Sequence, residues 1–299
     1  MQIGIDLGGT KIEIIALDHH GQTLHRQRVP TPQGDYQAIL RSITQLVEDA
    51  EAQLGLHATV GIGTPGSISP ATGRLQNSNS TCLNDQPLLQ DLQHCLQRPV
   101  QIANDANCFA LSEAADGAAA GASNVFGVII GTGTGAGIVI NGKVLQGANG
   151  IAGEWGHNPL PWPREEELPG PACYCGKSGC LETYLSGPGL AKNHQRAYGE
   201  SLTPAEMVLR ASEGDQHCEA SLRYFEDCLA RGLAHVINVL DPEVIVLGGG
   251  LGNIERIYHN VPKIWSKYIF SNSIQTQLRR PMFGDSSGVR GAAWLGSRA

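Results

Sequence analysis

The sequence predicts an α/β protein with layered sheets, and three observations support this fold class. The order strand, glycine turn, strand occurs twice, first near residue 8 and again near residue 133. Stretches with the apolar period of helices stand between short apolar runs that are typical of buried strands. Strands interleaved with helices in this way characterise the α/β class, and no short-period repeat interrupts the pattern.

The first glycine turn joins two predicted strands, at residues 2–6 and 11–18. It supplies a carboxylate, Asp6, that can hold hydrated Mg²⁺, and it adds the hydroxyl of Thr10 and the ammonium of Lys11 as phosphate donors. Two glycines between them let a ligand approach the backbone closely. A simple turn between strands would explain one such hairpin equally well, so the second hairpin matters for the interpretation.

Between the hairpins, the apolar positions of residues 35–54 follow a helical period. Short apolar strands are predicted at 59–64 and 100–103, and a further helix at 107 to about 120. Asp105 therefore lies at the carboxyl end of a strand. From spacing alone it has two equal interpretations, a catalytic base or the N-cap of the following helix.

The second hairpin consists of a strand at 124–130, a glycine-rich turn at 131–137 and a returning strand at 138–140. The turn also fits the dinucleotide-binding pattern with alanine in third place, and Glu154 follows at a suitable distance. That fingerprint must open a helix, whereas a strand and the turn pair 141–142 follow here. The dinucleotide interpretation is therefore rejected.

The last third of the chain continues the alternation of helices and strands. Residues 203–206 form a capping box with proline at the first helical position, and the apolar stripe of residues 222–240 predicts a long buried helix. A strand at 243–247 then runs into the glycines 248–250, which predicts either backbone that another group approaches closely or simply a buried turn.

Three cysteines, Cys173, Cys175 and Cys180, gather in one short segment with glycines between them. In a cytosolic chain such a cluster predicts a metal site rather than disulfides. Cysteines packed as small hydrophobes are the alternative, but cysteines bordered by glycine and lysine make a poor core stripe. The same segment resembles the end of a P-loop, yet the leading glycine that this motif needs would fall at Pro171.

Composition limits the partners. The 299-residue chain, 41% hydrophobic, is long enough for one large core or two ordinary ones. Its 21 basic and 28 acidic residues give a formal charge of −7, the wrong sign for a protein that binds nucleic acid. An acid at position 6 interrupts the first apolar residues, which predicts neither a signal peptide nor a membrane span. We expect a cytoplasmic protein without a membrane partner.

The two glycine hairpins resemble the nucleotide-binding pair of the actin, hexokinase and heat-shock ATPase superfamily. With the other motifs they resemble, essentially end to end, the ROK family of repressors and sugar kinases. The motifs that carry this similarity are the two hairpins, Asn104-Asp105-Ala106-Asn107-Cys108, Gly153-Glu154-Trp155-Gly156-His157 and the cysteine cluster. The resemblance implies a two-lobed actin/hexokinase-like (ribonuclease H-like) fold with a zinc-binding insertion.

The resemblance also implies boundaries for the lobes. A small N-terminal lobe is expected at residues 1–118, completed by a C-terminal helix at 289–299. A large lobe is expected at 119–288, with the zinc motif at 157–180.

Among ROK enzymes the chain is most similar to bacterial fructokinases, also described as manno(fructo)kinases, in residues 65–70, 77–81 and 154–162. This implies ATP-dependent phosphorylation of a hexose, D-fructose to fructose 6-phosphate, with Asp105 as general base. Glucose, mannose or N-acetylglucosamine kinase activity, or a sugar-sensing regulator, are the alternatives.

The family motifs imply a role for each matching residue. Sugar-binding residues are Asn104, Asp105, Glu154, His157 and Glu182. Zinc ligands are His157, Cys173, Cys175 and Cys180, with one ring nitrogen of His157 on zinc and the other on the sugar. ATP, with Mg²⁺, is expected at Gly4, Ile5, Asp6, Leu7, Gly8, Gly9, Thr10, Lys11, Gly131, Thr132, Gly133, Thr134, Gly135, Ala136, Gly137 and Gly249.

ROK repressors bind DNA through an added helix-turn-helix domain. Here the sequence starts on the first phosphate strand and its charge is acidic, so a kinase is expected rather than a DNA-binding regulator. Many ROK kinases are dimers, which makes a homodimer the assembly to look for.

Overall fold

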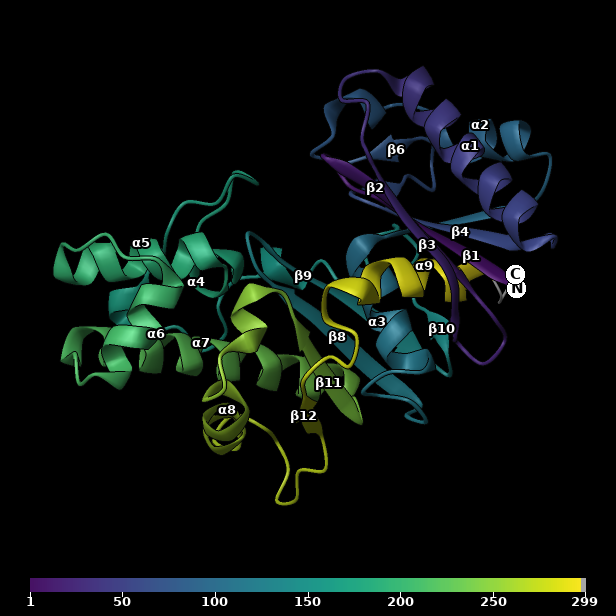
Figure 1. Ribbon diagram of the computed structural model, residues 1–299. Coiled ribbons are helices and arrows are strands. Elements are labelled where there is room, and N and C mark those ends of the chain that lie inside the picture. Colours follow the sequence, from purple (N-terminus) through teal and green to yellow (C-terminus); the bar gives the residue numbers. More distant parts are fainter. Residues whose placement is uncertain (297–299) are drawn as a thin grey trace. The chain divides into compact units, whose positions relative to one another are not determined.

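The computed structural model describes residues 1–296 and divides the chain into two units. The first unit consists of residues 1–123, 137–152 and the chain from 282 onward, and the second of residues 124–136 and 153–281. Figure 1 shows the elements of both. No helix among the described residues combines the length and the apolar character that crossing a membrane would need.

A five-stranded sheet in the order β3-β2-β1-β4-β7 forms the centre of the first unit. Strands β1 and β3 both run antiparallel to β2, whereas β4 and β7 run parallel to β1. The carboxyl ends of β1, β4 and β7 therefore meet at one edge. The strands are β1 (Gln2–Leu7), β2 (Lys11–Leu17), β3 (Thr23–Pro30), β4 (Thr59–Thr64) and β7 (Val100–Asn104).

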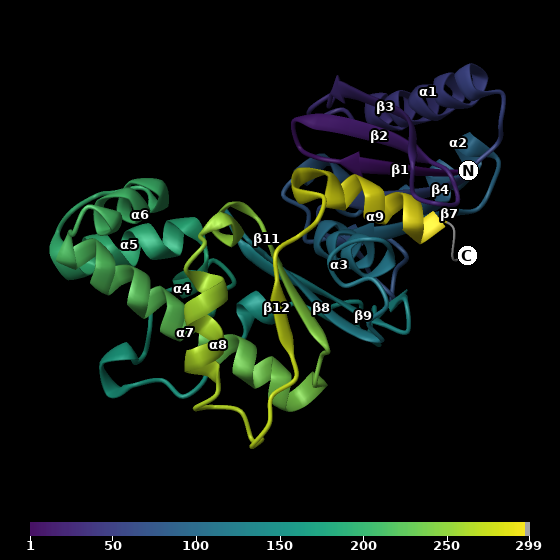
Figure 2. The same cartoon turned by 60° about the horizontal axis from the view of Figure 1, so that its bottom comes forward.

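Two helices, α1 (Tyr36–Leu54) and α2 (Leu88–Leu96), cover one face of this sheet (Figures 1 and 2). Their buried side chains join those of the strands in one apolar core. Asp35 caps the start of α1 by accepting the Ala38 amide, and Gly55 ends the helix in the left-handed conformation. A small two-stranded sheet, β5 (Ser67–Ile68) with β6 (Leu75–Gln76), precedes α2.

The other face of the sheet is covered by α9 (Ser287–Gly296), and α3 (Asp105–Ala115) packs against α9. Glycines allow this close approach: a Cβ at Gly4 would lie 2.2 Å from the Val289 carbonyl oxygen, and one at Gly61 would lie 2.0 Å from that of Ala292. The predicted C-terminal helix thus begins two residues earlier than expected, and its last positions, 297–299, lie outside the described residues.

The first unit is larger than the predicted small lobe of residues 1–118, because it also takes in 119–123, 137–152 and 282–288. Close packing of the returning strand explains part of this difference. A Cβ at Gly137 would lie only 2.5 Å from the Ala106 carbonyl oxygen on α3. The backbone after Gly137 is therefore held by α3, a long-range contact that the local sequence does not show.

The second five-stranded sheet has the order β10-β9-β8-β11-β12, and β8, β11 and β12 are parallel. Strand β9 begins at Thr134, so the exposed turn is shorter than the predicted 131–137. The strands are β8 (Asn124–Ile130), β9 (Thr134–Ile140), β10 (Lys143–Val144), β11 (Val244–Gly248) and β12 (Gln277–Arg279).

Helices make up much of the second unit, and α5, α6 and α7 pack together. The capping box at Thr203 and Glu206 is confirmed, with reciprocal side-chain and backbone hydrogen bonds. The helices are α4 (Glu182–Leu185), α5 (Gly187–Tyr198), α6 (Pro204–Ser212), α7 (Gln216–Leu240) and α8 (Ile257–Trp265).

Candidate functional site

The first glycine turn is held from its inner side and open on its outer side. The Gly8 amide donates to the Lys11 carbonyl oxygen at 3.0 Å, and the Thr31 hydroxyl donates to the Gly8 carbonyl oxygen at 2.7 Å. Gly9, Thr10 and Lys11 are exposed. We call residues 8–11 the first tip; its backbone and the Lys11 ammonium are accessible to an anionic ligand.

Three of the residues predicted at this nucleotide site have a packing role in the structure. Ile5 and Leu7 are fully buried in the apolar core, and Gly4 makes room for α9. Their side of β1 therefore supports the first tip without being part of its accessible surface.

Two carboxylates, Asp6 and Asp105, lie at the carboxyl edge of the first sheet. Asp6 is paired across β1 and β4 with Gly63, which is paired in turn with Ala103 just before Asn104. Burial, and then the charge of Asp105, raise the pKa of Asp6 to about 6. Ligands of open α/β sheets bind at this edge.

Asn104, and not Asp105, caps α3. Its Oδ1 accepts the Asn107 amide at 2.8 Å, so the helix begins at Asp105, two residues earlier than predicted. Asp105 Oδ1 accepts the Ala106 amide at 2.8 Å, which fixes the orientation of the carboxylate. The side chain reaches solvent but is surrounded by protein, and this desolvation raises the pKa of Asp105 despite the amide contact. Asn104, and not Asp105, therefore has the role of N-cap.

A hollow of about 450 Å³ lies beside the first tip within the first unit. Gly9, Thr10 and Thr31 line it, together with residues 79–82. Hydroxyl and amide groups predominate in this wall, as polyol or phosphate binding would require. The sequence segment 77–81, which carries similarity to fructokinases, thus ends next to the predicted phosphate turn.

The second glycine turn has its own anchors. The Gly131 amide donates to the Gly133 carbonyl oxygen at 2.9 Å, and the Gly187 amide at the start of α5 donates to the Gly131 carbonyl oxygen at 2.7 Å. Thr132 and Gly133 are exposed and form, with Gly131, the second tip. Thr134 and the predicted nucleotide residues Ala136 and Gly137 are buried in β9, and Gly135 is partly buried.

Gly249 lies close to this second tip. It has φ of +80°, and a Cβ would lie 2.5 Å from the Ile130 carbonyl oxygen, so only glycine fits. A Cβ at Gly131 would lie 4.0 Å from the Gly250 amide nitrogen. Gly249 and Gly250 are exposed, which leaves the platform beside the second tip open.

The segment that carries Glu154 and His157 is fixed to the core of the second unit through Trp155. The buried indole donates to the Gly232 carbonyl oxygen on α7 at 3.3 Å and meets the Phe126 ring edge-on at 5.8 Å. Because Trp155 is anchored, Glu154 is left exposed and His157 partly exposed.

The four predicted metal ligands converge. The ligand atoms of His157, Cys173, Cys175 and Cys180 all lie within 4.8 Å of one another. Cys173 Sγ is 3.7 Å from His157 Nδ1, and Cys175 Sγ is 3.6 Å from Cys180 Sγ. Tetrahedral zinc would require about 3.6 Å between sulfur and nitrogen and about 3.8 Å between two sulfurs. The donor set and spacing fit zinc.

Sequence reasoning missed Tyr174. It lies between two of the cysteines and is 82% exposed, and its hydroxyl is 3.0 Å from His157 Nε2, the ring nitrogen opposite the cysteines. Partial desolvation, and then the charges of Glu182, Cys173, Glu154 and Cys175, raise the pKa of Tyr174. This phenol therefore stands among three of the predicted sugar-binding residues.

The predicted site residues fall into two groups. The first unit brings together Asn104, Asp105, Asp6 and the first tip. The second unit brings together the second tip, the glycines at 249–250, the four metal ligands and the carboxylates Glu154 and Glu182, of which Glu182 accepts the Thr134 amide.

Comparisons with known proteins show the family of this chain. The family model described as "ROK family" matches residues 2–299. An N-acetyl-D-glucosamine kinase of Yersinia pseudotuberculosis is 38% identical over 299 residues, which cover 99% of this chain and 98% of the relative. The enzyme of the same name from Pasteurella multocida is 40% identical over 300 residues, with 99% of each chain covered.

Solved structures share the fold over the full length. A ROK hexokinase from Thermus thermophilus superimposes with a TM-score of 0.87 at 33% identity and covers 98% of this chain and 97% of its own. A ROK family glucokinase from Streptomyces griseus, in complex with glucose and AMPPNP, gives a TM-score of 0.76 at 28% identity, with 100% and 99% of the chains covered.

Proposed function

The chain belongs to the ROK family, and on this premise we propose that it is an ATP-dependent hexose kinase whose preferred sugar is N-acetyl-D-glucosamine. The position of Asp105 is the observation that carries the proposal. Its carboxylate lies at the sheet edge used for ligands, its capping role is taken by Asn104, and its pKa is raised. These are the properties of a general base for a hydroxyl.

Asp105 would take the proton from the attacking sugar hydroxyl, which we propose to be the 6-hydroxyl. The oxygen forms a bond to the γ-phosphorus in line with the departing ADP, whose bond to that phosphorus breaks. The orientation fixed by the Ala106 amide positions the base before the sugar arrives. Closure of the site would exclude water, which would otherwise compete as acceptor.

The phosphates of ATP are proposed to bind the backbone of the two tips, with the Lys11 ammonium as an additional donor. Asp6 would hold hydrated Mg²⁺, which, when bound, neutralises phosphate charge during transfer. Gly249 and Gly250 provide an exposed platform beside the second tip, where the adenosine would rest.

The sugar hydroxyls are proposed to bind Asn104, Glu154, His157 and Glu182 in addition to the base. Asn104 uses its side-chain oxygen for the helix cap, so its amide N–H groups would be the donors to the sugar. Tyr174 occupies His157 Nε2, so we propose that it acts as a gate: the sugar takes this nitrogen only after the phenol moves away.

Zinc is proposed as a structural ion held by the His157 Nδ1 and the three cysteine sulfurs. The set contains four protein donors and leaves no position for a reacting water, so the ion would stabilise the loop and take no part in chemistry. It would fix the tautomer of His157 and hold the chain just before Glu182.

D-Fructose is the second candidate. It is favoured by the similarity of residues 65–70, 77–81 and 154–162 to fructokinases, and residues 79–81 line the hollow at the first tip. The relatives in the comparison point to N-acetyl-D-glucosamine instead of fructose. We therefore rank fructose below the N-acetylated sugar.

Initial rates with Mg-ATP on a panel of N-acetyl-D-glucosamine, D-fructose, D-glucose and D-mannose test the proposal, with ADP release as the readout. Asp105→Asn serves as the control and should lose about 10²- to 10⁴-fold in turnover while sugar and ATP still bind. ADP release with none of the sugars would refute the kinase, and a higher kcat/KM for fructose would overturn the choice of sugar.

A further inference from the structure

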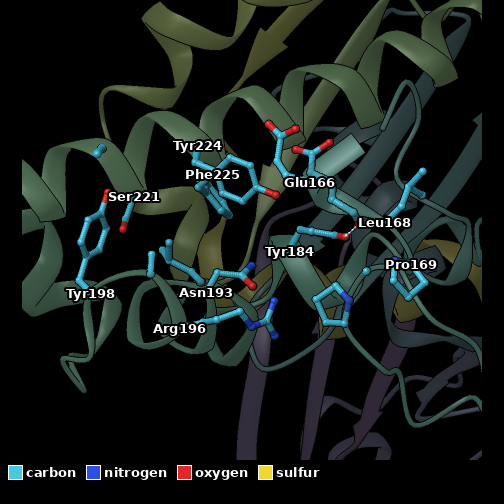
Figure 3. A pocket seen from close by; sticks show the side chains of 16 residues that line it. Glu166, Leu168, Pro169, Tyr184, Asn193, Arg196, Tyr198, Ser221, Tyr224 and Phe225 are labelled. Atoms are coloured by element: carbon cyan, nitrogen blue, oxygen red, sulfur yellow. Dashed lines mark hydrogen bonds between the residues drawn. The ribbon is translucent and has the colours of Figure 1, made fainter. Parts of the chain in front are cut away.

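A cavity of about 490 Å³ lies within the second unit, between α5, α7 and residues 166–171 (Figure 3). None of the predicted catalytic, sugar, nucleotide or metal residues lines it. Its volume is within the range of small-molecule sites in proteins. The cavity is therefore a candidate binding site separate from the proposed chemistry.

Aromatic rings form much of the cavity wall. Tyr198 comes from α5, Tyr184 from α4, and Tyr224 and Phe225 from α7 (Figure 3). Leu190 and Pro169 add apolar surface. Such a wall binds the faces of a ring, and the tyrosine hydroxyls provide polar contacts at its edges.

Two opposite charges stand at the walls without a partner. Arg196 lines the cavity from α5 and Glu166 from the segment across it (Figure 3). Both side chains are exposed to solvent at the cavity, and within residues 1–296 neither has an ion pair or a hydrogen bond. The adjacent Glu167 differs, because it is buried and accepts two hydrogen bonds from Arg231. The free charges are therefore those of Arg196 and Glu166.

We propose that this cavity is an effector site for a small zwitterionic ring compound. The ring would lie against the tyrosines, a phosphate or carboxylate would pair with Arg196, and an ammonium group would face Glu166. Amino sugar phosphates and aromatic amino acids share this chemistry. They are distinguished by experiment.

The cavity wall is connected to the metal loop, which suggests what the effector does. The Gly179 amide, next to Cys180, donates to the Pro171 carbonyl oxygen at 2.8 Å. A Cβ at Gly170 would lie 2.6 Å from Gly179 Cα and 2.7 Å from the Tyr184 hydroxyl. A ligand that holds residues 169–171 in place would thus also hold the loop and α4, whose first residue is Glu182.

The effector should therefore favour sugar binding. By linkage, it lowers the dissociation constant of the sugar by the same factor by which the sugar lowers that of the effector. This part of the inference rests on the proposed sugar site, whereas binding in the cavity does not. Binding measured by calorimetry without ATP keeps the two apart.

D-Glucosamine 6-phosphate and L-tryptophan are the two probes, each titrated into the full chain by calorimetry. Glucose 6-phosphate and N-acetyl-L-tryptophan, which lack the ammonium group, are the matched ligands. We expect one zwitterionic probe to bind at least about tenfold more tightly than its matched ligand, since a charge-assisted contact contributes at least a factor of this order.

Arg196→Ala and Glu166→Gln should each weaken binding of that probe by at least about tenfold. Lys192→Ala and Glu165→Gln, exposed neighbours on the same two segments, should leave it unchanged. If a sugar phosphate binds the active site instead, its affinity would be unchanged in all four variants. This outcome would refute the cavity as its binding site.

Absence of binding by both probes at about 10 mM, a concentration that reveals millimolar dissociation constants, would also overturn the proposal. Binding that is lost in Arg196→Ala but leaves sugar affinity unchanged would retain the site and refute its coupling to the metal loop.

Discussion

Glu182 Oε2 accepts a hydrogen bond from the Thr134 amide, with 2.9 Å between the two atoms. On the other side of the same residue, a Cβ at Gly156 would lie 2.0 Å from the Thr134 carbonyl oxygen. Thr134 thus connects the second tip both to the segment of His157 and to the helix that follows Cys180. The proposed phosphate and sugar contacts of the second unit are parts of one framework.

Replacing Glu182 separates its two roles. Glu182→Gln keeps an oxygen that can accept the Thr134 amide but loses the charge, so the sugar KM should rise while the ATP KM stays within about twofold. Glu182→Ala removes both the charge and the acceptor, so both KM values should rise, by about tenfold for each charge-assisted hydrogen bond that the substitution removes.

Steady-state kinetics with each substrate varied measures this difference. Glu48→Ala, at an exposed position of α1, is the control and should behave as the wild type. Equal effects of Gln and Ala on the ATP KM would show that the bond to Thr134 does not organise the second tip.

Removing the Tyr174 hydroxyl should make the sugar site easier to enter. In Tyr174→Phe the His157 Nε2 no longer has the phenol as a partner, so the sugar KM should fall by about two- to fivefold, as expected for the loss of one competing exposed hydrogen bond. kcat should change little because the base is untouched. A rise in the sugar KM would contradict the gate and indicate that the hydroxyl itself binds the sugar.

Loss of the metal should raise the KM of the sugar more than the KM of ATP. Cys175→Ser, or treatment with a strong chelator, should release one equivalent of zinc and raise the sugar KM at least about tenfold, since supporting groups of metal sites act at this scale. Metal analysis and kinetics on the same samples test this. Cys95→Ser, at an exposed cysteine of α2, should keep the metal and the activity. Wild-type protein purified without zinc would refute the site.

In the pH profile, kcat/KM should begin to fall at a higher pH than an ordinary aspartate would cause. Burial and the charge of Asp105 raise the pKa of Asp6 to about 6, and desolvation raises the pKa of Asp105. Both groups must be ionised for the proposed reaction, so kcat/KM should fall as the pH drops through about 6, well above the usual value of about 3.9. Circular dichroism at each pH controls for unfolding. A constant kcat/KM down to pH about 5 would contradict the assignment.

Arg231 should be critical for the stability of the second unit. Its guanidinium is 1% exposed and pairs with the buried Glu167, at 2.6 Å between Nη2 and Oε1. Arg231→Met would leave that carboxylate buried without its partner, which costs about 3–5 kcal/mol.

Urea unfolding monitored by circular dichroism measures this cost. Arg210→Met is the matched control, because the pair of Arg210 with Glu200 is half exposed and contributes about 0–1 kcal/mol. Equal midpoints for both variants would show that the buried pair does not stabilise the unit.

Local patterns predicted much of the secondary structure. Strands β4 and β8, helix α1 and the capping box of α6 coincide closely with their predicted ranges, because apolar period, glycine stops and caps are properties of neighbouring residues. Strand β3 was not predicted. Its residues are mostly exposed, and it is a strand because it pairs with β2.

The site residues also divide into those that local patterns predicted and those that they did not. Cysteine spacing identified the metal ligands, and glycine clustering identified the two tips. One of the two interpretations of Asp105, as the N-cap of α3, was wrong because Asn104 is the cap. Asn104 and Asp105 are both good capping residues, and only the backbone geometry chooses between them. The sequence did not indicate a role for Tyr174, because its contact with His157 is visible only in the folded chain.

By itself the sequence determined the α/β class, the two glycine turns, the cysteine set and the candidate base, all of which are encoded in short segments. Only the tertiary structure decided that Thr134 joins Glu182, that Gly4 and Gly137 serve packing, and that residues 137–152 belong with the first unit. Those decisions depend on contacts between residues distant in the chain, where the approach of one backbone to another, and not local preference, determines which residue fits.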